Sequence, residues 1–170
     1  PRCGRRRAGS TLRASSIRVP CLVHDGVTVW DTLSIAEYLH ETFPNVGVYP
    51  GDRMARARCR SIAGEMHSGF SALRSSLPMN LRTEGRHIAI WSAAQTDIEG
   101  ITPIRGECLE TWKGPWLFGR HPTVADAMYA PVVTRFRSYS VSLDPACAAY
   151  CDHVWRWPHL TEWVAAALLE

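Results

Sequence analysis

The residues best suited to chemistry in this chain are an acid–hydroxyl pair, Asp31-Thr32, and the dipeptide Val19-Pro20 that precedes it. A helix that begins at such a pair offers free N–H groups and the positive end of its dipole to a carboxylate. The acid can pair with an ammonium group. A structural role is the alternative, because a hydroxyl at the start of a helix is a common N-cap. The pair therefore predicts either a site for a charged small ligand or a plain capped helix.

The segments around this pair predict a β-hairpin followed by a helix. Residues 19–23 and 27–30 are apolar and β-favouring, and the Asp-Gly dipeptide between them is a strong hairpin signal. Apolar residues then recur at helical spacing over 32–43, until Pro44 stops the helix. We expect Thr32 to cap this helix.

The rest of the chain has helical periodicity. One long helix is expected over 53–77, where apolar residues recur every three or four positions. A second is expected over 84–113. A proline inside a helix costs about 3 kcal/mol if the helix stays straight. Because Pro103 lies inside this segment, we expect a kink or a break near Thr102.

A capping box marks the next helix. Thr123 and Asp126 have the spacing of a hydroxyl at the N-cap and an acid at the third helical position, which predicts a helix running to about residue 138. Two more helices are expected over 145–157 and 160–168.

Composition indicates a globular protein of 170 residues, with 46% hydrophobic and 21% charged residues. No apolar run approaches the roughly 20 residues that span a bilayer, so no membrane partner is expected. The net charge of +3 is uneven: residues 1–18 hold six arginines and no acid, which leaves 13 basic against 16 acidic side chains elsewhere.

This basic N-terminal segment is open to three interpretations: a nucleic-acid or membrane-surface tail, a targeting segment, or sequence foreign to the fold. We favour the third and expect an irregular basic arm over 1–16. No base-reading motif accompanies it, so no nucleic-acid partner is expected. The six cysteines show no C-x-x-C pair, which favours a reduced, cytoplasmic setting. Cys147 and Cys151 are expected to be buried thiols rather than metal ligands.

Two stretches of the sequence resemble the glutathione S-transferase family, in particular a bacterial branch of it. The first joins Val-Pro-Cys-Leu, the Asp-Gly turn and Trp-Asp-Thr-Leu-Ser-Ile-Ala-Glu-Tyr-Leu, over 19–39. The second is the helical part, with Glu-Met-His-Ser-Gly-Phe at 65–70 and the capping box within 117–126. The resemblance covers roughly residues 17–170.

The resemblance implies an α/β plus all-α fold. Residues 17–47 would form a partial thioredoxin-like domain, a β-β-α remnant that binds glutathione, and residues 48–170 an all-helical C-terminal domain. Nothing in residues 1–16 has the pattern of the family's first β-α-β unit, so we expect the chain to lack that unit. Family members usually dimerise through both domains, so a homodimer is expected.

The resemblance also implies roles for individual residues. The bond between Val19 and Pro20 would be cis, and the Val19 backbone would pair with the cysteinyl backbone of glutathione. Asp31 and Thr32 would hold the γ-glutamyl end. Arg18 is a candidate for the glycyl carboxylate. No metal is expected, and glutathione is the expected cofactor, as a substrate.

The electrophile pocket would lie along the first helix of the second domain, with Met66, His67 and Phe70 as candidates. Ordinary roles compete: a packed or surface histidine for His67, and core for the other two. The family activates the glutathione thiol with a Ser, Tyr or Cys near the end of its first strand, so that a thiolate can attack the electrophile. No residue in 1–16 matches that group. The catalytic residue is therefore unknown, and we expect impaired catalysis.

Three functions remain open. The first is a glutathione S-transferase acting on hydrophobic electrophiles. The second is a non-catalytic module of the same fold used for binding or dimerisation. The third is a glutathione-dependent enzyme like maleylacetoacetate isomerase, which shares the fold.

Overall fold

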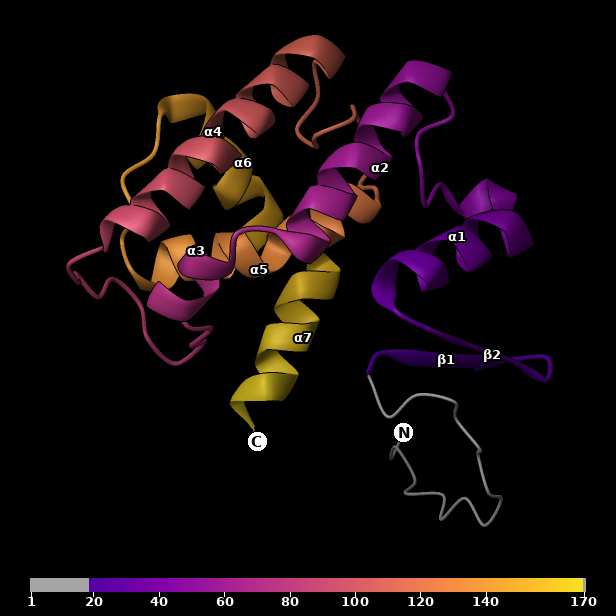
Figure 1. Ribbon diagram of the computed structural model, residues 1–170, viewed down its shortest axis with the longest axis horizontal. Coiled ribbons are helices and arrows are strands. Elements are labelled where there is room, and N and C mark those ends of the chain that lie inside the picture. Colours follow the sequence, from indigo (N-terminus) through magenta and orange to yellow (C-terminus); the bar gives the residue numbers. More distant parts are fainter. Residues whose placement is uncertain (1–18, 170) are drawn as a thin grey trace.

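A computed structural model describes residues 19–169. Its elements are β1 (Cys21–His24), β2 (Val27–Trp30), α1 (Thr32–Thr42), the 3₁₀ turn η1 (Pro44–Val46), α2 (Arg53–Ser68), α3 (Ser71–Ser76), α4 (Ser92–Trp112), α5 (Val124–Ser138), α6 (Pro145–Trp155) and α7 (Pro158–Leu168). The hairpin and α1 lie on one side of α2, and α3, α4 and α6 lie on the other (Figure 1). None of the described helices has the length and apolar character needed to cross a membrane.

The β-β-α unit is held together by one face of its hairpin. The strands pair antiparallel, with Cys21 opposite Trp30. His24 lies on the face that meets α1: its Nδ1 is 2.9 Å from the Tyr38 hydroxyl, and its ring is 5.4 Å from that of Phe43. Cys21 and Trp30 share the other face and are exposed. The hairpin thus packs on α1 from one side, as its alternating pattern requires.

Helix α5 is the centre of the helical body. It packs against α2 and α6, and most of its residues are buried. A capping box starts it, because the Asp126 carboxylate accepts the Thr123 N–H at 2.8 Å and the Thr123 side chain accepts the N–H at the third helical position. The same carboxylate accepts the Leu117 N–H at 3.0 Å and the Tyr150 hydroxyl at 3.1 Å. Asp126 therefore ties α5 to the preceding loop and to α6.

A fully buried arginine completes this core. The guanidinium of Arg105 on α4 lies 5.1–5.3 Å from three aromatic ring centres, those of Tyr129, Phe136 and Tyr150. Its Nη1 is 3.4 Å from the Cys151 sulfur. Cation–π attraction is strongest where the cation is desolvated, so the three rings offset part of the cost of burying this charge.

The single helix predicted over 53–77 is wrong, since the structure has two helices, α2 and α3. Gly69 ends α2, and a Cβ there would lie 2.8 Å from the Glu65 carbonyl oxygen, so only glycine fits. Phe70 follows with φ 54°, in the left-handed region. This pair of residues turns the chain between the helices.

The helix predicted over 84–113 begins later and is not divided. The backbone N–H groups of Gly85 and Arg86 donate to the carbonyls of Arg137 and Ser138 at the end of α5. These two residues therefore bond to α5 instead of forming a helical turn of their own. Helix α4 begins at Ser92 and runs through Pro103. Pro103 has no N–H to donate to the Glu99 carbonyl, which lies four residues earlier. Because both residues are exposed, water can bond to this carbonyl instead.

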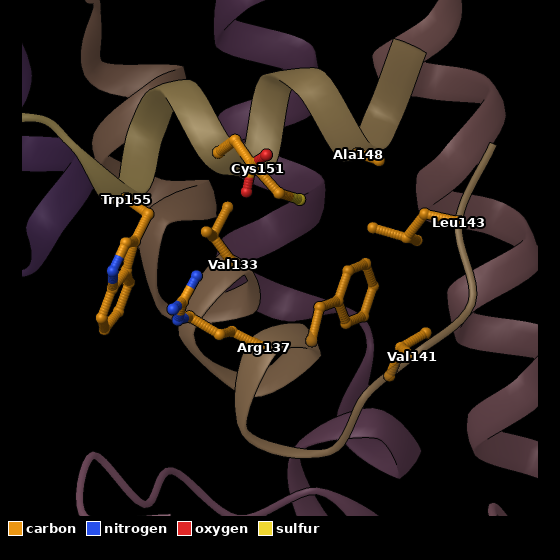
Figure 2. A pocket seen from close by; sticks show the side chains of 9 residues that line it. Val133, Arg137, Val141, Leu143, Ala148, Cys151 and Trp155 are labelled. Carbon is orange, nitrogen blue, oxygen red and sulfur yellow. The ribbon is translucent and has the colours of Figure 1, made fainter. Parts of the chain in front are cut away.

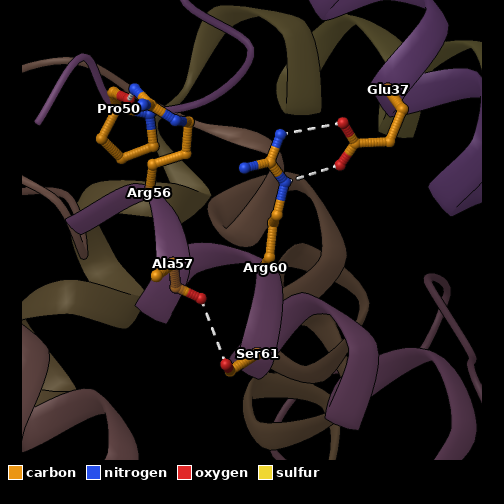
Figure 3. Close-up of polar contacts among 6 residues, drawn as sticks. All are labelled: Glu37, Pro50, Arg56, Ala57, Arg60 and Ser61. Carbon is orange, nitrogen blue, oxygen red and sulfur yellow. Dashed lines mark hydrogen bonds and ion pairs between the residues drawn. The ribbon is translucent and has the colours of Figure 1, made fainter. Parts of the chain in front are cut away.

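A bidentate ion pair joins α1 to α2 (Figure 3). The Arg60 Nε and Nη2 donate to the two carboxylate oxygens of Glu37 at 2.8 and 2.9 Å. The guanidinium also lies 4.7 Å from the ring centre of buried Tyr49. The hydrogen bond from Arg60 is the main cause that lowers the pKa of Glu37. The pair therefore fastens the β-β-α unit to the helical body.

Replacing Glu37 with glutamine should lower the free energy of unfolding by about 0.5–1 kcal/mol, the range for a well-formed exposed pair. A carboxyl whose folded pKa is lowered stabilises the fold above its ordinary pKa of 4.5 and loses that contribution as the pH falls through the folded value. The difference between Glu37→Gln and the unsubstituted chain should accordingly shrink in acid. Urea denaturation at pH 7 and below pH 4.5 measures it. Glu41→Gln, on the exposed side of the same helix, is the control. An equal loss of unfolding free energy in both variants would contradict a stabilising role for the ion pair of Glu37.

Candidate functional site

Asp31 and Thr32 lie at the junction of β2 and α1. Asp31 is the N-cap of α1, because its Oδ1 accepts the backbone N–H groups of Leu33 and Ser34 at 2.9 and 3.4 Å. The expectation that Thr32 caps this helix is wrong, since Thr32 is the first helical residue. Both residue types are good N-caps, so the sequence could not choose between neighbours. At φ 74° and ψ 133°, the Asp31 backbone turns its carboxylate onto the first turn of the helix.

This cap leaves polar groups open to a ligand. The Asp31 side chain is 41% exposed. The hydrogen bond from the Leu33 N–H is the main cause that lowers the pKa of Asp31, so the carboxyl is ionised at neutral pH. No residue in the described range 19–169 bonds to the Thr32 N–H or hydroxyl. The start of α1 thus offers an acceptor for a cation beside donors for an anion.

Val19 and Pro20 lie immediately before β1. Their peptide bond is cis, and both residues are exposed. Within residues 19–169, β1 has β2 as its one partner strand, and no described strand lies along its other edge. Arg18 lies outside the described residues, as does the region 1–16. The roles of Val19, Pro20 and Arg18 toward glutathione stay predictions.

The three electrophile-pocket candidates have different surroundings. Met66 is 3% exposed and belongs to the core. The Phe70 ring lies against Gly100 of α4. The His67 side chain is 37% exposed, and its Nε2 lies 3.0 Å from Oδ2 of Asp31. His67 is therefore the one of the three that contacts the acid–hydroxyl pair, and an electrophile pocket formed by these residues stays a prediction.

An apolar cavity of about 320 Å³ opens beside Thr32. It lies between α1 and the beginning of α5, with Trp157 at its side, and Ile35, Leu39 and Ala127 contribute to its wall. An apolar cavity therefore lies next to the polar groups of the acid–hydroxyl pair.

A smaller cavity of about 150 Å³ lies away from this pair, between α5 and α6 (Figure 2). Cys151 and Trp155 line it from α6, and Arg137 lines it from α5. Burial raises the pKa of the Cys151 thiol, although Arg105 opposes that shift, so the thiol is protonated at neutral pH and is a poor nucleophile. In the described part of the chain, no cluster of three or more His, Cys, Asp or Glu side chains is placed to hold a metal ion.

Similarity to known proteins decides the family. Residues 53–166, about two thirds of the chain, match the family described as glutathione S-transferase, C-terminal domain. The chain belongs to the glutathione S-transferase family. The predicted fold class is confirmed: a β-β-α unit of thioredoxin-like type followed by the helical domain of the glutathione S-transferases.

Individual relatives agree with this assignment. A probable maleylacetoacetate isomerase of Caenorhabditis elegans is 30% identical over 129 residues, 75% of this chain and 60% of that protein. The maleylacetoacetate isomerase of Rattus norvegicus is 30% identical over 128 residues, 75% of this chain and 58% of that protein. The structure of a glutathione transferase homologue from Burkholderia gl BGR1, with bound glutathione, is 26% identical with a TM-score of 0.68 and covers 91% of this chain and 76% of that one. The chain spans about 60% of the length of these curated relatives.

The contact between His67 and Asp31 is the feature of the candidate site that the sequence did not predict. The two residues are far apart in the chain and lie on different elements, α2 and the start of α1. The sequence had named both residues as candidates, Asp31 for glutathione and His67 for the electrophile pocket, and this was the one sign that they could lie close together. Only the packing of α1 on α2 shows that they meet.

Proposed function

We propose that the start of α1 binds the γ-glutamyl end of glutathione and that the protein is a glutathione S-transferase acting on electrophilic small molecules. The observation that carries this proposal is the ionised, half-exposed Asp31 beside the open N–H and hydroxyl of Thr32. The γ-glutamyl end carries one ammonium and one carboxylate, which match this acceptor and these donors. The glutathione in the Burkholderia homologue's structure supports the class of ligand.

Catalysis requires that the bound thiol become a thiolate, which then attacks the electrophile. The thiol-activating residue is unassigned among residues 19–169. The hydrophobic electrophile, the homodimer and the domain boundary at residue 47 stay predictions. Conjugation of glutathione to chlorodinitrobenzene by the full chain tests the transferase activity.

An isomerase is the second candidate, because the relatives from Caenorhabditis elegans and Rattus norvegicus bear the name maleylacetoacetate isomerase. Such an enzyme uses glutathione without consuming it. Measuring glutathione loss and maleylacetoacetate isomerisation in parallel separates the two activities. Glutathione binding without either reaction would favour a binding module.

Replacing Thr32 with alanine should weaken glutathione binding about five- to tenfold, because it removes one hydroxyl hydrogen bond and leaves the backbone N–H. Ser34→Ala is the matched control, since Ser34 lies one position beyond Leu33 on the same turn and contributes its backbone N–H to the cap. Isothermal titration with glutathione measures both. Unchanged affinity in Thr32→Ala would remove Thr32 from the site.

A further inference from the structure

The Asp31 carboxylate is anchored from two elements at once. Its Oδ1 accepts the N–H groups of Leu33 and Ser34 within α1. Its Oδ2 lies 3.0 Å from Nε2 of His67, which is in the last turn of α2. Because an ionised carboxylate only accepts hydrogen bonds, Nε2 of His67 must carry the proton in this contact.

These contacts leave one acceptor position of the Asp31 carboxylate free for a ligand. An ionised carboxylate offers about four acceptor positions, two on each oxygen. Leu33 and Ser34 occupy both positions on Oδ1, and His67 occupies one on Oδ2. The remaining position is on Oδ2 of a side chain that is 41% exposed. A single donor such as a primary ammonium fits it, whereas a guanidinium needs both oxygens for its bidentate geometry.

The backbone of Asp31 shows that this arrangement is held in place. Its φ of 74° is one that a non-glycine residue adopts when its surroundings enforce it. Such conformations concentrate at ligand clamps, where they aim a side chain. The N–H groups of α1 hold one oxygen of the carboxylate, and the His67 imidazole contacts the other.

We infer that His67 is a positioning residue: its 3.0 Å contact with Oδ2 of Asp31 aims the free position on that oxygen at the ammonium of a γ-glutamyl ligand. The inference rests on the proposed function and narrows the class of ligand that the site accepts. The site selects ligands with a free primary amine at the γ-glutamyl end and discriminates against deaminated ones. His67 thereby contributes to the glutathione side of the site rather than to an electrophile pocket.

Titration with two ligands tests this role on the full chain. The ligands are glutathione and glutaryl-cysteinyl-glycine, the same tripeptide without its amine. The unsubstituted chain should prefer glutathione by about tenfold or more. His67→Leu should weaken glutathione binding about fivefold and leave the binding of the analogue unchanged. His67→Gln, which keeps a donor, should restore most of the loss, and His87→Leu, at an exposed histidine in the segment before α4, should change neither affinity.

A double-mutant cycle separates positioning from a general structural effect. If His67 acts through Asp31, then His67→Leu should have no further effect in a chain that already carries Asp31→Asn. Unchanged glutathione affinity in His67→Leu, an equal loss for both ligands, or an effect that persists beside Asp31→Asn would overturn the inference alone. Failure of the unsubstituted chain to bind glutathione would overturn the proposed function and the inference with it.

Discussion

Replacing Asp126 with alanine should lower the free energy of unfolding by about 3–5 kcal/mol, the largest effect of any single substitution considered for this protein. The carboxylate is fully buried and accepts hydrogen bonds from the N–H groups of Leu117 and Thr123 and from the Tyr150 hydroxyl. Alanine would leave these donors buried without a partner, at about 1–3 kcal/mol each before relaxation, and would remove half of the capping box. Chemical denaturation measures the change.

Two variants make this prediction specific. Asp126→Asn keeps an acceptor oxygen and should cost less than alanine. Asp152→Ala removes an exposed carboxyl from α6 and should change stability by less than about 0.5 kcal/mol. A loss below about 1 kcal/mol in Asp126→Ala would show that the loop before α5 and helix α6 are not joined through this carboxylate.

Replacing Asp31 with asparagine should weaken glutathione binding about 10- to 100-fold. A hydrogen bond between charged groups contributes about 1.5–3 kcal/mol, and asparagine removes the charge that meets the ligand ammonium. Asparagine is itself a good N-cap, so α1 should keep its start and the folded chain its stability. Isothermal titration gives the affinity, and thermal unfolding without ligand gives the stability.

Asp52→Asn is the matched control for this substitution. Asp52 caps α2 by accepting the Ala55 N–H at 2.8 Å, so the same exchange occurs at a helix start outside the candidate site. Glutathione affinity should be unchanged in Asp52→Asn. Equal losses in the two variants would mean that a change of charge anywhere weakens binding, and the role of Asp31 would be wrong.

Local sequence signals predicted most of the elements. The hairpin and the helix after it follow from β-favouring runs, an Asp-Gly turn and helical spacing, all of which act over a few residues. The capping box at Thr123 predicted the beginning of α5 for the same reason. Errors arose where neighbouring residues compete, as at the cap of α1, or where one glycine ends a periodic pattern, as at Gly69.

Contacts between distant elements could not be predicted. The apolar pattern of α4 gives no sign that Arg105 is buried among aromatic rings of α5 and α6. The pairing of His67 with Asp31 likewise depends on how α1 packs on α2. The candidate residues were therefore chosen by type and position and stay predictions, whereas the contacts between them required the fold.

Isothermal titration of the full chain with glutathione tests whether the start of α1 is a ligand site. We expect binding in the micromolar to low millimolar range, about −4 to −8 kcal/mol, with an affinity that falls in Asp31→Asn and not in Asp52→Asn. A folded, helical chain that shows no heat of binding would contradict this expectation, because the acid–hydroxyl pair at the start of α1 would then be a helix cap and nothing more.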